Sequence, residues 1–320
     1  MVVTALVLVL VLPDNDSYIF LPDEPHPVLP LISVQNGVKP DGRGGIFFVD
    51  VIVKQPSIAE RFFPDLFHDG ASLVPAHAVN PTGLSEQDRR RSSLQMMSRS
   101  QRLAAAVALR AAGYRVRVTQ QGAFVVQVLP GTPAARELHP SDVIVEIEGE
   151  RVGTLAKLRS LLASKQPGDR ISLVVRRDGK PLRLAIRLGA DPSNKRRAVM
   201  GVLVEQAASI RLPLKVEIDT GNVGGPSAGL AMALGLLEKL GRDVDRGRRV
   251  AATGEIGIDG SVAPVGGIKQ KTIGAREAGI QLFLVPAGDN AREASQYAED
   301  MRVAPVKSIQ QALQVLATAG

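Results

Sequence analysis

The sequence Gly224-Gly225-Pro226-Ser227-Ala228-Gly229 decides how the C-terminal part of this chain folds and which chemistry it can carry. One serine stands among small residues, directly before a stretch whose apolar residues recur at helical spacing through Leu240. The pattern predicts a turn that exposes the Ser227 hydroxyl at the start of a helix. Backbone N–H groups and the helix dipole at such a start favour a developing oxyanion, as acyl transfer requires. We therefore interpret Ser227 as a nucleophile that needs a base.

A lysine, rather than a histidine, is the predicted base. The chain has four histidines, all N-terminal to Ser227, and no residue pattern links any of them to the serine. Residues 266–279 are typical of a short helix with glycine at both ends, and a helical wheel places Lys271 on its apolar stripe and Lys269 on the flank. Burial lowers a lysine pKa from about 10.4 toward neutrality, which makes the amine a usable base. The alternative is a surface helix with two ordinary lysines.

Several spaced motifs in residues 198–320 resemble the proteolytic domain of the Lon family of Ser–Lys proteases. The resemblance covers residues 225–229, 253–256, 264–268, 271, 283–286 and 306–309. It implies that Ser227 is the nucleophile and Lys271 the base, in agreement with the helical wheel. It also implies that Thr253 supports the site by orienting the lysine, whereas a turn residue at a strand end is the alternative for this threonine.

The resemblance implies an oxyanion hole made by backbone N–H groups near Gly224 and Gly225, and neither a metal nor an organic cofactor. Many Lon proteases carry an acidic residue three positions before the serine, where this chain has Gly224. A glycine still supplies its backbone N–H, so the departure predicts altered restraint of the site and leaves the expectation of activity in place.

The composition limits the other classes of function. A chain of 320 residues with 45% hydrophobic residues is long enough for two domains with cores of their own. Cysteine is absent, which excludes disulfides and thiolate metal sites. The net charge of +7 permits nucleic-acid or membrane contacts, but aromatics make up only 3%, so base-stacking platforms are scarce and we expect no nucleic-acid binding.

The N-terminus begins with an apolar run over residues 1–13. The run is shorter than the roughly 20 residues of a membrane-spanning helix and lacks the positive flank of a signal peptide. A buried strand is the alternative, but the run is followed at once by Pro13-Asp14-Asn15-Asp16. We favour part of an N-terminal membrane anchor, which would place the catalytic part at the cell membrane on its extracytoplasmic side.

Residues 26–190 contain a predicted strand, a predicted helix and a region that resembles a second domain. Residues 26–84 contain a predicted strand over 46–54, which we expect to join the sheet of the proteolytic domain. A helix is predicted over 85–112 from a helix-start box. Residues 113–190 resemble a bacterial PDZ domain, with a helix near 155–164, strands at 171–176 and 182–188, and a return linker at 191–194.

PDZ domains bind an extended peptide along a sheet edge, and backbone N–H groups usually hold its C-terminal carboxylate. The predicted carboxylate loop is Gly113-Tyr114-Arg115-Val116, although these residues depart from the usual pattern and the alternative is that they only begin a strand.

Together the parts predict an α+β fold in which a PDZ-like β-rich domain is inserted into a Lon-type proteolytic domain. The whole resembles the membrane-anchored, PDZ-containing Lon-like proteases, and family resemblance implies a homo-oligomer, often a hexamer. Because no Gly-x-x-x-x-Gly-Lys-Ser/Thr motif is present, we expect an ATP-independent serine endopeptidase that cleaves unfolded or flexible polypeptides. The alternatives are a non-catalytic PDZ scaffold and a protease subunit driven by a separate ATPase.

Overall fold

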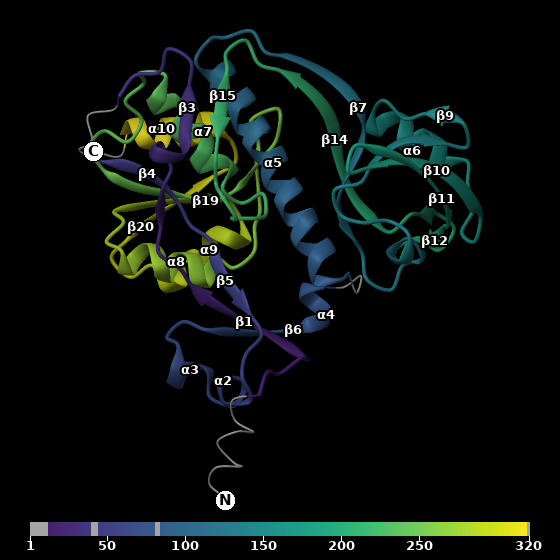
Figure 1. The fold of residues 1–320 in the computed structure, drawn as a ribbon, viewed down its shortest axis with the longest axis horizontal. Coiled ribbons are helices and arrows are strands. Elements are labelled where there is room, and N and C mark those ends of the chain that lie inside the picture. The colour runs from purple at the N-terminus through teal and green to yellow at the C-terminus, as the bar shows by residue number, and fades with distance from the viewer. Residues whose placement is uncertain (1–11, 40–43, 81–83, 319–320) are drawn as a thin grey trace, which may run out of the picture. The chain divides into compact units, whose positions relative to one another are not determined.

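A computed structural model describes residues 12–39, 44–80 and 84–318 (Figure 1). Contacts between Cα atoms divide the chain into two compact units. The first unit comprises Met1–Val79, Met96–Val116 and Leu212–Gly320, and the second Asn80–Gln95 and Arg117–Arg211. In the described part of the chain, no helix combines the length and the apolar character that crossing a membrane would need. Most of the predicted anchor, residues 1–11, lies outside the described residues.

A five-stranded sheet forms the centre of the first unit, with strand order β2-β4-β16-β19-β20. All neighbouring pairs are parallel except β2 with β4. The strands are β2 (His26–Pro27), β4 (Gly45–Phe48), β16 (Arg249–Ala252), β19 (Leu282–Pro286) and β20 (Arg302–Val306). The sheet is thus built from segments far apart in the sequence, because β4 pairs along its whole length with β16.

Four helices enclose this sheet, with α7 and α10 on one side and α8 and α9 on the other (Figure 1). The helices are α7 (Gly229–Lys239), α8 (Ile268–Glu277), α9 (Asp289–Tyr297) and α10 (Ile309–Thr318). Every residue of α7 except Lys239 is buried, as its apolar sequence predicts. Ile268 of α8 packs with Phe283 of β19 in the core between helix and sheet.

Smaller elements complete the first unit. An antiparallel sheet has the order β5-β1-β6, and two further pairs are β15 with β3 and β17 with β18. These strands are β1 (Ser17–Pro22), β3 (Ile32–Val34), β5 (Val51–Lys54), β6 (Ser72–Pro75), β15 (Val216–Ile218), β17 (Glu255–Ile256) and β18 (Val262–Ala263). The short helices are η1 (Leu29–Leu31), α2 (Ile58–Phe62), α3 (Pro64–Phe67) and α4 (Ala76–Val79).

The single strand predicted over 46–54 is two strands in two different sheets. β4 belongs to the central sheet and β5 pairs with β1 in the small sheet. Val49 and Asp50 form the break between them, and Val49 is fully buried in the core that includes Ile268 and Ala275 of α8. The continuous apolar sequence concealed this change of sheet, because apolar residues are needed on both sides of the break.

The second unit is an antiparallel sheet in the order β11-β10-β8-β7-β14, with β9 paired to β8 and a separate pair of β12 and β13. The strands are β7 (Arg117–Val128), β8 (Val143–Ile147), β9 (Glu150–Arg151), β10 (Arg170–Arg177), β11 (Lys180–Arg187), β12 (Gly189–Ala190), β13 (Ala198–Val199) and β14 (Val202–Arg211). Its helices are η2 (Pro133–Arg136) and α6 (Leu155–Ala163). Residues such as Ile144, Leu173 and Ile186 fill a core of its own.

This unit reaches further along the chain than the predicted 113–190. β14 pairs with β7 over ten register positions, from Val202 with Val128 to Arg211 with Arg117. The predicted return linker at 191–194 is a turn between β12 and β13, and the second unit ends at Arg211. A long two-stranded ladder therefore holds together residues that the sequence placed in separate domains.

The predicted helix over 85–112 is α5 (Glu86–Ala111), and the division between the units falls within it. Gly113 adopts a φ of +90° and donates to the Arg110 carbonyl, while the Tyr114 N–H donates to that of Leu109. This pattern is a Schellman cap, in which glycine satisfies the last helical carbonyls at no steric cost.

Candidate active site

Ser227 lies in a turn directly before α7, as its sequence predicts, and its side chain is half-buried. The Ser227 carbonyl accepts hydrogen bonds from the Gly254 N–H at 2.8 Å and from the Thr253 hydroxyl at 3.3 Å. These two bonds fix the serine turn to the segment after β16. At Gly229, a Cβ atom would lie 2.8 Å from the Ser100 hydroxyl and 3.0 Å from Ile256, so only glycine allows this close approach.

Lys271 meets Ser227 from α8. Its Nζ atom is 2.9 Å from Ser227 Oγ and 3.4 Å from Thr253 Oγ1. Lys271 is only 3% exposed, whereas Lys269 is half-buried and donates to the Ala71 carbonyl, so the structure confirms the helical wheel. Burial lowers the pKa of Lys271 from 10.5 to about 8, while the negative field of Asp50 acts in the opposite direction. A lysine with this pKa has a neutral, basic fraction near neutral pH.

The helix that carries Lys271 begins at a glycine with special geometry. Gly267 caps α8 in the left-handed conformation with a φ of +69°. A Cβ atom there would lie 2.6 Å from Val51 of β5. Further along α8, a Cβ atom at Gly274 would lie 2.1 Å from the Asp23 carbonyl oxygen. Two glycines therefore let the helix lie directly against the segments that contain Asp23 and Val51.

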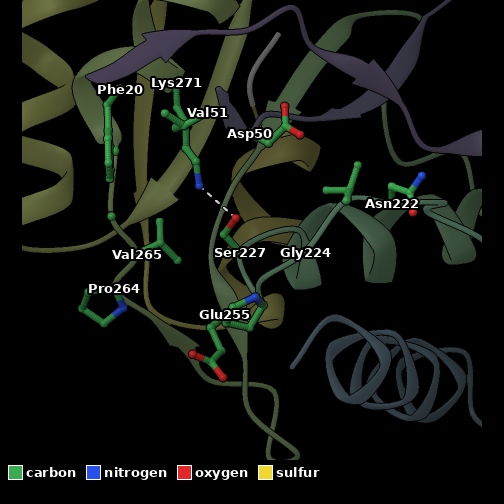
Figure 2. A pocket seen from close by; sticks show the side chains of 14 residues that line it. Phe20, Asp50, Val51, Asn222, Gly224, Ser227, Glu255, Pro264, Val265 and Lys271 are labelled. Carbon is green, nitrogen blue, oxygen red and sulfur yellow. Dashed lines mark hydrogen bonds between the residues drawn. The ribbon is translucent and has the colours of Figure 1, made fainter. Parts of the chain in front are cut away.

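The Ser227–Lys271 pair lies in a cavity of about 680 Å³ within the first unit (Figure 2). Phe20 of β1, Val51 of β5 and Val265 give it an apolar side. Glu255 lines it as well, and its carboxylate lies 3.5 Å from the Arg99 guanidinium of α5. The arrangement offers a hydroxyl, a basic amine and an apolar wall to one bound chain.

Gly224 and Gly225 precede the serine in the same loop. Gly224 lines the cavity, and Gly225 has a φ of +84°, which favours glycine. The structure thus brings Gly224, Ser227 and Lys271 to one cavity. Gly225 follows Gly224 in the same loop, and Thr253 is fully buried 3.4 Å from Lys271 Nζ.

Asp50 is a cavity residue that our sequence reasoning missed. It lies in the break between β4 and β5 and lines the same cavity as Lys271. The one signal in the sequence was a carboxylate in the middle of the apolar run Phe47-Phe48-Val49-Asp50-Val51. An acidic residue there is costly unless it serves a polar site.

Two groups of side chains among the described residues bring three possible metal-ligand atoms together, namely Asp23–His26–Asp50 and Glu238–Asp243–Asp245. In the second group, one Glu238 oxygen already accepts the N–H groups of Val244 and Asp245 at 2.5 and 2.7 Å. That carboxylate therefore stabilises the loop after α7 by accepting its backbone N–H groups. The first group borders the active-site cavity through Asp50.

A second cavity, of about 950 Å³, lies within the second unit between β14 and α6. Leu158 and Leu162 of α6 face Val202 and Val204 of β14 across it. β14 is the last strand of its sheet and pairs only with β7 among the described strands, so its other edge can accept a further strand. Met200 and Gly201 precede β14 at one end of this groove.

The four residues predicted as a carboxylate loop lie elsewhere. Gly113, Tyr114, Arg115 and Val116 belong to the first unit, and none of them is among the residues that line the groove. Gly113 and Tyr114 cap α5 instead. Gly201 has a φ of +80° at the groove, and a Cβ atom there would lie 2.4 Å from Thr132.

Comparisons with known proteins find two different families in this chain, although their limits differ from those of the two units. Residues 203–319 match the C-terminal proteolytic domain of Lon protease (S16), and residues 111–188 match the PDZ domain family. The chain carries a Lon-type proteolytic domain and a PDZ domain. The Lon protease of Phenylobacterium zucineum (strain HLK1) is 33% identical over 133 residues, which are 41% of this chain and 16% of that protein.

Two further proteins illustrate the likeness. The periplasmic pH-dependent serine endoprotease DegQ of Escherichia coli (strain K12) is 37% identical over 82 residues, which are 25% of this chain and 18% of DegQ. The PDZ domain of an SdrC-like protein from Listeria monocytogenes is 28% identical, with a TM-score of 0.26, over 28% of this chain and 92% of that domain. The chain thus spans a small part, 16% and 18%, of the two curated relatives named here.

Proposed function

We propose that this protein is a serine endopeptidase in which Ser227 is the nucleophile and Lys271 the general base. One observation carries the proposal: the amine of Lys271, a residue that is only 3% exposed, lies 2.9 Å from the hydroxyl of the serine, as nucleophilic catalysis requires. The match of residues 203–319 to the Lon proteolytic domain supports the same chemistry.

The proposed reaction has two stages, acylation and deacylation. Neutral Lys271 takes the proton from Ser227 Oγ as the oxygen attacks the peptide carbonyl carbon, and a tetrahedral intermediate forms. Lys271 then gives that proton to the leaving amine as the C–N bond breaks, which leaves an acyl-enzyme. Water attacks the ester with Lys271 as base, and the proton returns to Ser227 as the acid product leaves.

Neighbouring groups support each step. The Thr253 hydroxyl, 3.4 Å from Lys271 Nζ, keeps the amine directed at the serine. The backbone N–H groups of the loop from Gly224 and Gly225 to Ser227, at the N-terminal end of α7, stabilise the oxyanion. The apolar side of the cavity at Phe20 and Val51 suits an extended substrate, so unfolded or flexible polypeptides are the proposed substrates, cleaved without ATP.

Hydrolysis of casein by the purified full chain without nucleotide tests this function. We expect Ser227→Ala and Lys271→Ala each to abolish cleavage, and Ser295→Ala and Lys307→Ala, which change exposed residues on the same unit, to leave it unchanged. Cleavage that survives in the first two variants would exclude the dyad. Cleavage that appears only with added ATP and a separate ATPase would favour the alternative of a driven subunit.

The groove of the PDZ domain is the proposed site for peptide C-termini. Its apolar lining and the open edge of β14 fit a peptide that binds as an added strand, with its carboxylate at the backbone of Met200 and Gly201. Arg196 and Arg197 also line this cavity. Arg197 is paired with Asp191 at 3.3 Å, so Arg196 is the arginine of the two that favours an anionic end.

Fluorescence polarisation with a labelled peptide of apolar C-terminal sequence distinguishes this groove from the loop at 113–116. We expect Val204→Glu to weaken binding at least tenfold, and Leu203→Glu, on the opposite face of β14, to leave it unchanged. Loss of binding in Tyr114→Ala alone would place the carboxylate at the loop that the sequence predicted. Peptide binding with no effect of Ser227→Ala on any cellular role would favour the scaffold alternative.

A membrane anchor at the N-terminus and self-assembly into a homo-oligomer complete the proposal. Leu12 ends the apolar sequence and accepts a hydrogen bond from the Ile58 N–H at the start of α2. Beyond it, α2 and α3 expose large apolar side chains at Phe62, Phe63, Leu66 and Phe67. A lipid surface is the proposed partner of this α2–α3 hairpin, with the catalytic domain outside the cytoplasm.

A further inference from the structure

Asp50 adds an acidic residue to the lining of the cavity that holds Ser227 and Lys271. Gly224 and Gly225 offer no side chain, so Asp50 and Glu255 supply the carboxylates among the described residues that line the cavity. Glu255 is paired with Arg99. Asp50 lies at the break between β4 and β5, beside the Ser227–Lys271 pair in Figure 2, and has a side chain that is 24% exposed.

Asp50 lies in a cluster of titratable side chains with His26 and Asp23. His26 Nε2 is 3.2 Å from an Asp50 oxygen and 3.5 Å from an Asp23 oxygen. The His26 ring packs on Phe48 with ring centroids 5.0 Å apart, and the pairing of β2 with β4 sets these two residues opposite each other. Backbone pairing of β2 with β4 therefore places the His26 ring next to the Asp50 carboxylate.

The same cluster is packed against the helix of the lysine. The Asp23 carbonyl touches α8 at Gly274, one turn after Lys271, where no side chain larger than hydrogen fits. The acidic cluster and the lysine thus belong to one part of the first unit, and Asp50 and Lys271 line the same cavity.

We propose that Asp50, held by Asp23 and His26, is a positioning residue whose charge governs how readily Lys271 takes the proton from Ser227. This inference rests on the proposed function, because it assigns a modulator to the same base. Asp50 stabilises the ammonium form of Lys271, and the buried environment stabilises the neutral form. The balance of the two sets the pH at which the base becomes available.

The directions of the pKa shifts agree with this balance. Burial lowers the pKa of Lys271, and the charge of Asp50 raises it. Burial and a hydrogen bond with Asp23 raise the pKa of Asp50, and His26 lowers it. Besides these groups, Glu255 of β17, with its Arg99 partner on α5, is the charged side chain that faces the cavity among the described residues.

The test compares Asp50→Asn with the wild-type chain across pH 5–10. Because removing the charge leaves burial unopposed, we expect the rise of kcat/KM to move to lower pH by roughly half to one unit, a roughly three- to tenfold gain on the acidic side. Asp289→Asn, an exposed residue of α9, is the matched control and should keep the wild-type profile. Asp50→Ser should behave like Asp50→Asn, and circular dichroism checks that both variants fold.

A second measurement does not depend on proteolysis. The rate at which 2,4-dinitrofluorobenzene labels Lys271, followed by peptide mass spectrometry, reports the ionisation of the amine directly. Its midpoint should move to lower pH in Asp50→Asn and stay in place in Asp289→Asn. An unchanged midpoint overturns the role of Asp50. A shifted midpoint without cleavage that depends on Ser227 would retain Asp50 and overturn the proposed function instead.

Discussion

At the scale of single residues, the site depends on one lysine that is kept out of water. The pKa of Lys271 is about 8, below the ordinary 10.5, because burial disfavours its charged form. The free energy of unfolding rises with pH wherever the unfolded chain binds more protons than the native one. Since the native lysine loses its proton first, its unfavourable contribution to stability is complete below pH 8 and disappears by about pH 10.5.

Replacing Lys271 by methionine removes that contribution. We expect Lys271→Met to raise the free energy of unfolding at pH 7 by up to about 3 kcal/mol, since one pKa unit corresponds to about 1.4 kcal/mol, and to lose this advantage at pH 10. Urea denaturation at both values measures it, with Lys307→Met, at an exposed site, as the control. An equal difference at pH 7 and pH 10 would mean that packing, rather than ionisation, separates the two proteins.

Thr253 contributes through two contacts made by one hydroxyl. It donates to the Ser227 carbonyl at 3.3 Å and lies 3.4 Å from Lys271 Nζ, and the residue is fully buried. Thr253→Val keeps the shape and removes the hydroxyl, so we expect kcat to fall roughly 10- to 100-fold with little change in KM. Thr253→Ser, which keeps the hydroxyl, should restore most of the rate. A fall of equal size in both variants would assign the effect to packing.

At the scale of elements, glycines decide where α8, the helix that carries Lys271, lies. Gly266 and Gly267 adjoin each other before α8, yet they differ sharply. Gly267 has a φ of +69° and no room for a Cβ atom beside Val51, whereas a Cβ atom at Gly266 meets nothing within 4 Å. We expect Gly267→Ala to destabilise the fold by roughly 1–3 kcal/mol and to lower activity by displacing Lys271.

Gly266→Ala is the matched control, and its thermal unfolding should differ little from that of the wild type. Differential scanning calorimetry of both variants, together with casein cleavage, measures the effect. Equal melting temperatures for the two variants would show that α8 adjusts its first turn freely, and the argument from close approach to β5 would fail.

The sequence predicted an element well where its pattern of apolar residues reported a single element. The deeper burial of Lys271 than of Lys269 followed from helical periodicity, although α8 also buries Gln270 and Thr272, which the apolar stripe does not include. The strand over 46–54 was predicted as one element, because apolar residues continue through the break at Asp50. The long ladder of β7 with β14 was missed, since pairing between residues so distant in the chain leaves no local signal.

At the scale of the whole molecule, an exposed apolar surface lies next to Leu12, the described end of the N-terminal apolar sequence. The apolar run of the N-terminus ends at Leu12, which is hydrogen-bonded to the first residue of α2. The α2–α3 hairpin then exposes Phe62 at 68% and Leu66 at 78%. Apolar groups so exposed lower their free energy by entering a lipid interface, and a net charge of +7 favours anionic headgroups.

The absence of cysteine from the chain allows this surface to be probed at single sites. Leu66→Cys, labelled with the fluorophore NBD, should brighten and shift to the blue when the full chain meets vesicles of phosphatidylglycerol and phosphatidylethanolamine. Arg292→Cys on α9, which is exposed, should not respond. Adding Phe62→Ser and Phe67→Ser should weaken the response at residue 66. If the fluorescence without vesicles rises with protein concentration, the hairpin instead contacts a second copy of the chain. If chains sediment with vesicles but the fluorescence does not change, the hairpin is not the part that touches the membrane.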